Sequence, residues 1–141
     1  MLLARPPALG ERPEGPTRAK LETLLREEAS HLAMLARAFA RLGADPTAQT
    51  PAADVAAVES SGVLKVIDPR TDLAQSLDAL LVAELTDNDG WWLLIDLART
   101  LGHDELANEF GRALAEEERH LAQVRGRVAA TTLAEARASA G

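Results

Sequence analysis

Three segments of this chain share one pattern, in which apolar residues recur in alternating steps of three and four. In residues 17–42 the series runs through Leu21, Leu25, Leu32, Leu35, Phe39 and Leu42, and one slot of the series is filled by Glu28 instead. This spacing places the residues along one face of an α-helix. The pattern therefore predicts a helix with a mostly apolar face that carries a carboxylate near its middle.

The other two segments interrupt their apolar series in the same way. Residues 72–101 are apolar at Leu73, Leu77, Leu80, Trp91, Leu94, Ala98 and Leu101, with Glu84 and Asp87 in the slots between. Residues 104–130 are apolar at Leu106, Phe110, Ala113, Val124 and Val128, with Glu117 and His120 between. Only Gly102 and His103 separate these two helices, which predicts an antiparallel hairpin with Asp104 as the cap of its second helix.

The remaining segments differ in composition. Residues 1–16 contain four prolines and are expected to form a tail without regular structure. Residues 44–71 contain three prolines and a Ser-Ser-Gly, which argues against a long helix and predicts a long crossover. Thr17 and either Thr71 or Asp72 are candidate caps, and residues 131–141 are expected to fray. The chain is therefore predicted to be all-α, an antiparallel bundle of three long helices with the crossover between the first and the second.

Composition supports the helical class and excludes several functions. Apolar residues make up 47% of the 141 residues but aromatics only 3%, and the apolar share is mostly Ala and Leu, the strongest helix formers. The net charge of −7 argues against a nucleic-acid partner. The absence of cysteine excludes disulfides, thiolate ligands and thiol nucleophiles. Pro6 and Pro7 interrupt the apolar N-terminal stretch, so we expect no membrane span and a cytoplasmic protein.

Two nearly identical strings carry the candidate chemistry, EEASHLA at residues 27–33 and EEERHLA at residues 116–122. Glu28 with His31, and Glu117 with His120, are three residues apart and share a helix face. Because an unpaired buried charge is costly, a divalent cation is an effective way to neutralise such a cluster. Carboxylates and imidazoles without sulfur suit iron(II), manganese(II) or zinc.

A single Glu–His pair of this spacing is also common on a solvated helix face. The coincidence of two such pairs with a carboxylate in the third helix, Glu84, favours a metal site. In this interpretation Glu116, Glu118 and Arg119 form the solvated side of the last helix. Asp87, one turn from Glu84, is either a neighbour of the site or a solvated acid.

Two helices with Glu-x-x-His, a third with a lone Glu and a long crossover resemble the ferritin-like superfamily, which includes rubrerythrins, manganese catalases and small bacterial ferritin-like domains. The resemblance covers residues 17–130. It implies two metal ions, iron first and manganese or zinc as alternatives, with Glu28 and Glu117 bridging them and His31, Glu84 and His120 as further ligands. The implied activity is that of an oxidoreductase that oxidises iron(II) or reduces dioxygen or peroxide. The alternative is a non-enzymatic bundle with a degenerate site that acts in assembly or in a stress-related interaction.

The first helix of the family, with its own glutamate, has no counterpart here. Its ligand could come from an absent start, from a partner chain or from the tail, or the site could be degenerate. Three helices with an uncovered apolar face would expose a large patch, which soluble monomers avoid. We therefore expect a homodimer or larger homo-oligomer that covers this face.

Overall fold

The structure, a computed structural model, describes residues 18–66 and 72–141 and is helical almost throughout. The helices are α1 (Arg18–Arg41), α2 (Pro51–Val66), α3 (Leu73–Thr100) and α4 (Asp104–Ser139). The described ranges contain no strand, so the predicted all-α class is confirmed. The expected tail at residues 1–16 and the Thr17 and Thr71 caps lie outside the described residues.

The segment between the first two long helices is more helical than the sequence suggested. It contains α2, sixteen residues long, where a connection without a long helix was expected. Pro51 is the first residue of α2, a position where the missing N–H of proline removes no helical hydrogen bond. The Thr50 hydroxyl accepts a hydrogen bond from the backbone N–H of Ala53 at 3.1 Å and so caps the helix. Pro51 therefore begins a helix here instead of breaking one.

The last helix is also longer than expected, because residues 131–139 continue α4 where fraying was predicted. Its alanine-rich sequence has high helix propensity and contains no breaker up to Ser139. Its beginning differs as well. His103, and not Asp104, occupies the N-cap position, and its side chain makes no capping hydrogen bond. At α3 the prediction is confirmed, since Asp72 and Gln75 form a reciprocal capping box.

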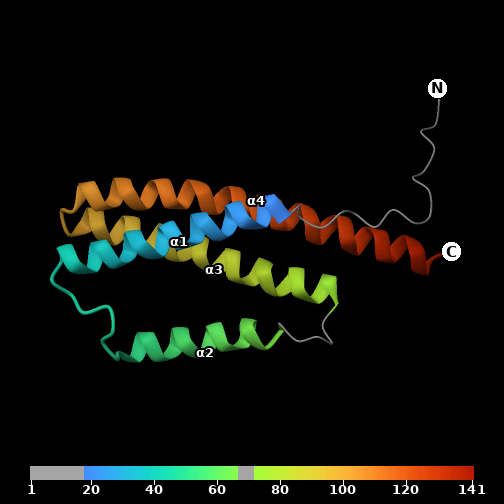
Figure 1. Ribbon diagram of the computed structural model, residues 1–141, viewed down its shortest axis with the longest axis horizontal. Helices are drawn as coiled ribbons and strands as arrows, with labels where there is room; N and C mark the ends of the chain where they lie inside the picture. Colours follow the sequence, from blue (N-terminus) through green and yellow to red (C-terminus); the bar gives the residue numbers. More distant parts are fainter. Residues whose placement is uncertain (1–17, 67–71) are drawn as a thin grey trace, which may run out of the picture.

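Helices α3 and α4 form the predicted antiparallel hairpin and pack along much of their length (Figure 1). Gly102 makes the tight reversal possible with a φ of 77°, and the backbone N–H of His103 donates to the carbonyl of Ala98 at 2.8 Å. This hairpin sets Glu84 on α3 opposite Glu117 and His120 on α4. Two of the three interrupted faces are thereby brought together by a local connection.

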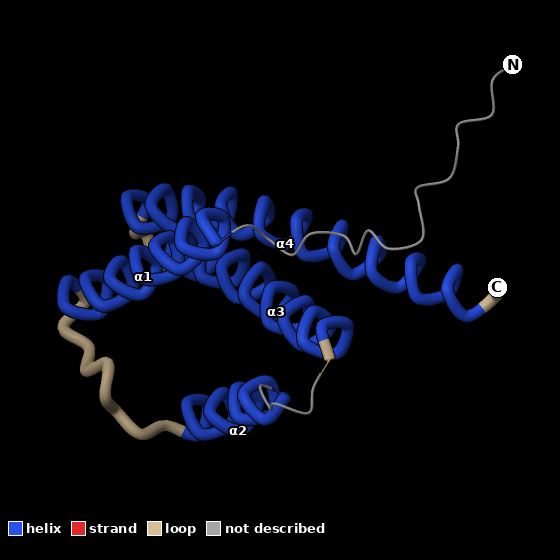
Figure 2. The backbone as a smooth tube through the Cα atoms, turned by 45° about the vertical axis from the view of Figure 1, so that its right-hand side comes forward, coloured by secondary structure: helices blue, strands red, loops and turns tan. Residues whose placement is uncertain are grey.

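Helix α1 packs on α4, and α2 packs on α3 away from α4 (Figures 1 and 2). At the C-terminal end of α1, Arg41 donates to Glu105 at 3.1 Å and to Glu109 at 2.9 Å. These ion pairs and the apolar cluster fix the end of α1 nearest the hairpin. The cluster consists of Ala38, Trp91, Ile95, Ala98, Leu106, Ala107, Phe110 and Ala113.

The face of α1 that is buried differs from the face that the sequence predicted. Among the α1 side chains that the structure describes, His31 and Ala38 are buried, whereas Leu25, Leu32 and Phe39 of the predicted apolar series are exposed. Helix α1 is thus turned so that only one edge of its apolar face meets the hairpin. None of the described helices has the length and apolar character needed to cross a membrane.

Candidate metal centre

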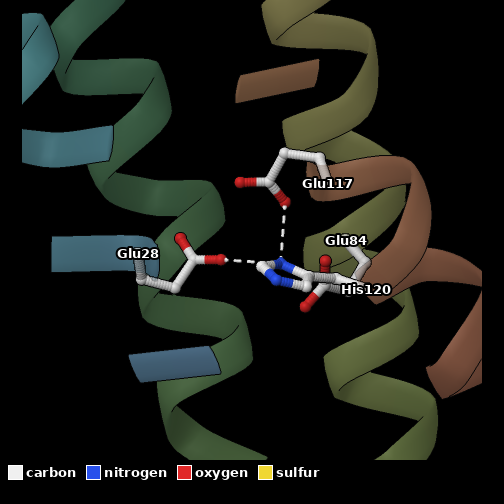
Figure 3. Close-up of side chains that lie close together, drawn as sticks. All are labelled: Glu28, Glu84, Glu117 and His120. Atoms are coloured by element: carbon white, nitrogen blue, oxygen red, sulfur yellow. Dashed lines mark ion pairs between the residues drawn. The ribbon is translucent and has the colours of Figure 1, made fainter. Parts of the chain in front are cut away.

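Three helices bring three carboxylates and one imidazole to a single point. Glu28 comes from α1, Glu84 from α3, and Glu117 and His120 from adjacent turns of α4 (Figure 3). One possible ligand atom of each residue lies within 4.8 Å of the corresponding atoms of the other three. Glu84, Glu117 and His120 are almost completely buried, and Glu28 is partly exposed. These four residues, called the carboxylate group below, could hold a metal ion.

The carboxylate group leaves three buried polar atoms unsatisfied. Glu84 Oε2, Glu117 Oε2 and His120 Nδ1 have no hydrogen-bond partner within the described part of the chain. A buried polar atom without a partner costs about 1–3 kcal/mol, and more if it is charged. All three atoms belong to residues that converge on the same point, and a cation there would satisfy them together. The residues present therefore fit a metal ion, and oxygen with imidazole nitrogen suits iron(II), manganese(II) or zinc.

A carboxylate outside the group holds the ring of His120. Its Nε2 lies 2.5 Å from Glu27 Oε2, while its Nδ1 lies 3.3 Å from Glu28 Oε1 and 3.6 Å from Glu117 Oε2. Because an ionised carboxylate only accepts hydrogen bonds, the Nε2–H donates to Glu27. When the ring loses its second proton, an unprotonated Nδ1 faces the other residues of the carboxylate group, which is the form that a metal requires.

The ring of His31 on α1 is held in the same way by two glutamates of α4. Its Nδ1 lies 2.7 Å from Glu117 Oε1 and its Nε2 lies 2.7 Å from Glu116 Oε2. A carboxylate oxygen therefore lies within hydrogen-bonding distance of each ring nitrogen. Trp91 packs edge-on against the ring with the centroids 5.5 Å apart. His31 is therefore fixed in place but, in this structure, bonds to Glu117 and is not one of the four converging residues.

Burial and mutual repulsion raise the carboxyl pKa values at the site. Loss of solvation, followed by the charge of Glu117, raises the pKa of Glu84 to about 7. The same two causes raise the pKa of Glu28 and of Asp87, although Asp87 keeps an exposed side. These groups are close enough to hinder one another's ionisation, and a divalent cation would remove that hindrance.

The hydrogen bond between Glu27 and His120 shifts both partners toward their charged forms. It is the main cause that lowers the pKa of Glu27. Burial opposes the protonation of His120, but the bond to Glu27 and the charges of Glu117 and Glu84 outweigh burial and raise the pKa of His120. In the metal-free protein, a proton on His120 thus supplies part of the positive charge that the carboxylates attract.

A cavity of about 370 Å³ lies between α1 and α3 and reaches the carboxylate group. Its walls are mostly apolar, and its polar lining comes chiefly from the acids of the site. The lining residues are Glu28, His31, Leu32, Leu35, Thr86, Asp87, Gly90, Trp91, Leu94 and Glu117. Asp87, for which the sequence left two interpretations, is therefore a neighbour of the site, one turn from Glu84.

Four of the five predicted ligands converge, and the fifth, His31, lies against one of them. The sequence analysis missed the role of Glu116, which it assigned to the solvated side, and of Glu27, which it did not single out. A signal for both was present in the repeat. The two strings share the tandem Glu-Glu and the His-Leu-Ala, but differ at the two positions between them. Because the first glutamate, Glu27 or Glu116, occurs in both strings, the repeat indicates a role for it that its position on the helix does not predict.

No family model, curated protein or solved structure matches this chain. The ferritin-like resemblance therefore rests on the residues and the helical arrangement alone.

Proposed function

We propose that this protein binds divalent metal at the carboxylate group and acts as a ferritin-like dimetal-carboxylate protein of the cytoplasm. The observation that carries the proposal is the convergence of three unsatisfied buried atoms, on Glu84, Glu117 and His120, from two helices. A purely structural core would bury leucines at these positions at no such cost. Iron is the first candidate ion, and manganese and zinc are alternatives for the same ligand set.

In this proposal each residue of the site has a role. Glu28, Glu84, Glu117 and the Nδ1 of His120 bind the first ion, and Glu27 orients the His120 ring. A second ion, implied by the family resemblance, would take the His31 Nδ1 that otherwise donates to Glu117. Trp91, Leu35 and Leu94 form part of the apolar wall of the cavity beside the centre. Bound iron or manganese would supply the redox chemistry, either oxidation of iron(II) or reduction of dioxygen or peroxide.

A second candidate function is a metal-free polar network in a bundle that serves assembly or a stress-related interaction. The observation that favours it is that both imidazoles already have carboxylate partners, since His31 bonds to Glu116 and Glu117 and His120 bonds to Glu27. In this alternative the hydrogen bonds between the imidazoles and the carboxylates stabilise the buried acids, and the remaining unsatisfied atoms are a tolerated cost.

Metal titration separates the two candidates. The purified protein is stripped with chelator and titrated with manganese(II), zinc(II) and, without oxygen, iron(II), and bound metal is counted by elemental analysis. The proposal expects uptake of one or two ions per chain, lost in Glu117→Ala and in His120→Ala but retained in Glu118→Ala, which removes an exposed acid from the same helix. Absence of uptake of all three metals would overturn it in favour of the polar network.

Redox activity needs its own measurement. Oxygen or peroxide consumption is followed after iron(II) or manganese(II) is added, and compared with the same metal in buffer. The dimetal proposal expects consumption that follows site occupancy and disappears in His120→Ala. Stable metal uptake with no acceleration over buffer would restrict the function to binding.

A further inference from the structure

The exposed apolar residues of α1 form a regular stripe that nothing in the described structure covers. Leu25, Leu32 and Phe39 are seven residues apart, and their exposed fractions are 65%, 71% and 42%. Ala29 and Ala36, also exposed, complete an alternating three-and-four series between them. This is the spacing of a helix that packs along a second helix. Helix α1 therefore has two packing faces, and within residues 18–66 and 72–141 only the one with His31 and Ala38 is used.

The second string of the repeat contains a leucine that corresponds to Leu32 and is buried. Leu32 follows His31 in the first string, and Leu121 follows His120 at the same place in the second. Leu121 is 8% exposed, whereas Leu32 is 71% exposed. Both leucines follow the histidine of their string and precede an alanine, and they differ in what covers them. The position of Leu32 is one that a further helix would bury.

The stripe borders the cavity between α1 and α3, and α3 offers a matching wall. Leu32 and Leu35 line the cavity on the α1 side, and Gly90 and Leu94 line it on the α3 side. Leu97 and Leu101 continue the α3 face at steps of three and four from Leu94, and both are more than half exposed. The α1 stripe and this α3 wall thus lie on either side of the cavity, and the exposed apolar surface that they form is called the groove below.

We propose that a second copy of this chain occupies the groove, with the two α1 helices antiparallel about a twofold axis at Leu32. A twofold contact needs a patch that is complementary to itself. The α1 stripe meets this condition, because Leu25 and Phe39 lie equally far before and after Leu32. About that axis, Leu32 meets Leu32 and Leu25 meets Phe39 of the second copy. Each α1 then covers the groove of the other chain.

The size of this contact is sufficient for a specific dimer. With 24 residues, α1 is about 36 Å long, and a helix face is about 10 Å wide. Each chain contributes one α1 face, about 360 Å², and the α3 wall from Gly90 to Leu101, which is about 16 Å long and adds about 160 Å². The surface buried per chain is therefore about 500 Å², or about 1,000 Å² for the two chains together, the size at which a specific interface begins.

The chain's own N-terminal segment is a poor alternative occupant. Pro6, Pro7, Pro13 and Pro16 leave at most five consecutive residues without proline in residues 1–16. Five residues make less than two turns of helix, far shorter than the stripe from Leu25 to Phe39. The second copy, in contrast, brings a helix of the required length with an unpaired apolar face of its own.

The oligomeric state tests this directly, with chelator present so that the result does not depend on metal. Light scattering coupled to size exclusion at about 50 µM should give twice the 15.0 kDa chain mass. Leu32→Glu should raise the dimer dissociation constant by about 30-fold or more, the effect of losing a central contact. The control is Leu133→Glu, the same change at an exposed leucine where α4 projects beyond the other helices (Figure 1). It should remain dimeric.

Cysteine cross-linking tests the twofold axis itself. The chain has no cysteine, so Leu32→Cys introduces a single thiol and should form a disulfide-linked dimer on mild oxidation, whereas Leu133→Cys should not. Circular dichroism of each variant confirms that the helices are intact, as expected for substitutions at exposed positions. A monomeric wild-type protein, a dimer that persists in Leu32→Glu, or a dimer of the Leu32→Cys variant that forms no disulfide would each overturn the proposed arrangement.

Discussion

His31 and His120 lie on different helices, and each ring binds the tandem glutamates of the other ring's helix. His31 on α1 contacts Glu116 and Glu117, and His120 on α4 contacts Glu27 and Glu28. The two rings are 6.4 Å apart between centroids. This exchange relates α1 and α4 by an approximate twofold symmetry around the carboxylate group. It also divides each Glu-Glu pair into a residue near the centre and a residue that orients a histidine.

The first prediction concerns the orienting glutamate. Glu27→Ala should weaken metal binding by about 10–100-fold, because the Nε2–H of His120 loses the acceptor that directs its Nδ1 to the centre. Glu27→Gln, which keeps an acceptor oxygen without the charge, should weaken binding less. Isothermal titration with manganese(II) or zinc(II) measures both. Equal affinities in wild type, Glu27→Ala and the exposed control Glu118→Ala would exclude this role for Glu27.

The second prediction is a pH dependence of stability in the metal-free protein. The ordinary pKa of a glutamate is 4.5, and that of Glu84 in the folded chain is about 7, so between these values the folded state binds more protons than the unfolded state. Stability must therefore fall as pH rises from 4.5 to 7, by on the order of 3 kcal/mol from this buried group. The raised pKa of His120 acts in the same direction, since the stability it contributes below pH 6.5 is lost as pH rises through the folded pKa.

Urea denaturation at pH 5, 6, 7 and 8 with chelator measures this dependence. Glu84→Gln is neutral at every pH and should flatten the curve between pH 5 and 7, while Glu118→Gln should leave it unchanged. Metal affinity should show the opposite trend and rise with pH up to about 7, because Glu84 must lose its proton to bind a cation. A wild-type curve as flat as that of Glu84→Gln would show that Glu84 ionises normally.

The third prediction separates stability from binding at one residue. Glu84→Leu replaces a buried carboxylate, one of whose oxygens has no partner, with an apolar side chain of similar size. Without metal it should stabilise the fold, by on the order of 1–4 kcal/mol, as apolar replacements of buried charges often do. The same variant should lose metal binding. Thermal melts with chelator and with added manganese(II) report both effects, and a destabilised metal-free variant would mean that Glu84 has a structural partner.

The fourth prediction tests the helical backbone with two glycines. Gly126 is within α4, and a Cβ added there meets nothing within 4 Å. Gly126→Ala should therefore raise the free energy of unfolding by about 0.5–1 kcal/mol. Gly102→Ala also meets no atom, but its φ of 77° suits glycine, so this change should destabilise the α3–α4 hairpin. Chemical denaturation of both variants measures whether each change raises or lowers the free energy of unfolding. Stabilisation by Gly102→Ala would contradict the turn geometry.

Much of the fold followed from local sequence. The spacing of apolar residues in three segments predicted three long helices, Asp72 was an expected cap, and the two-residue link at Gly102 predicted the hairpin. These features depend on residues close together in the chain. Where local signals conflicted, the prediction failed. The prolines of residues 44–71 predict a break in the helix, but Pro51 occupies the first turn of α2, where proline is tolerated.

The candidate site likewise has features that follow from local sequence and features that do not. Helical periodicity places Glu28, Glu84, Glu117 and His120 where leucines would otherwise stand, so the interrupted apolar faces can be identified within each helix. The partners of these residues depend on how the helices pack against one another. The rotation of α1 about its axis buries His31 against Glu116 and Glu117 and leaves Leu32 exposed. That rotation is set by contacts between residues more than eighty positions apart, and periodicity within one helix does not encode it.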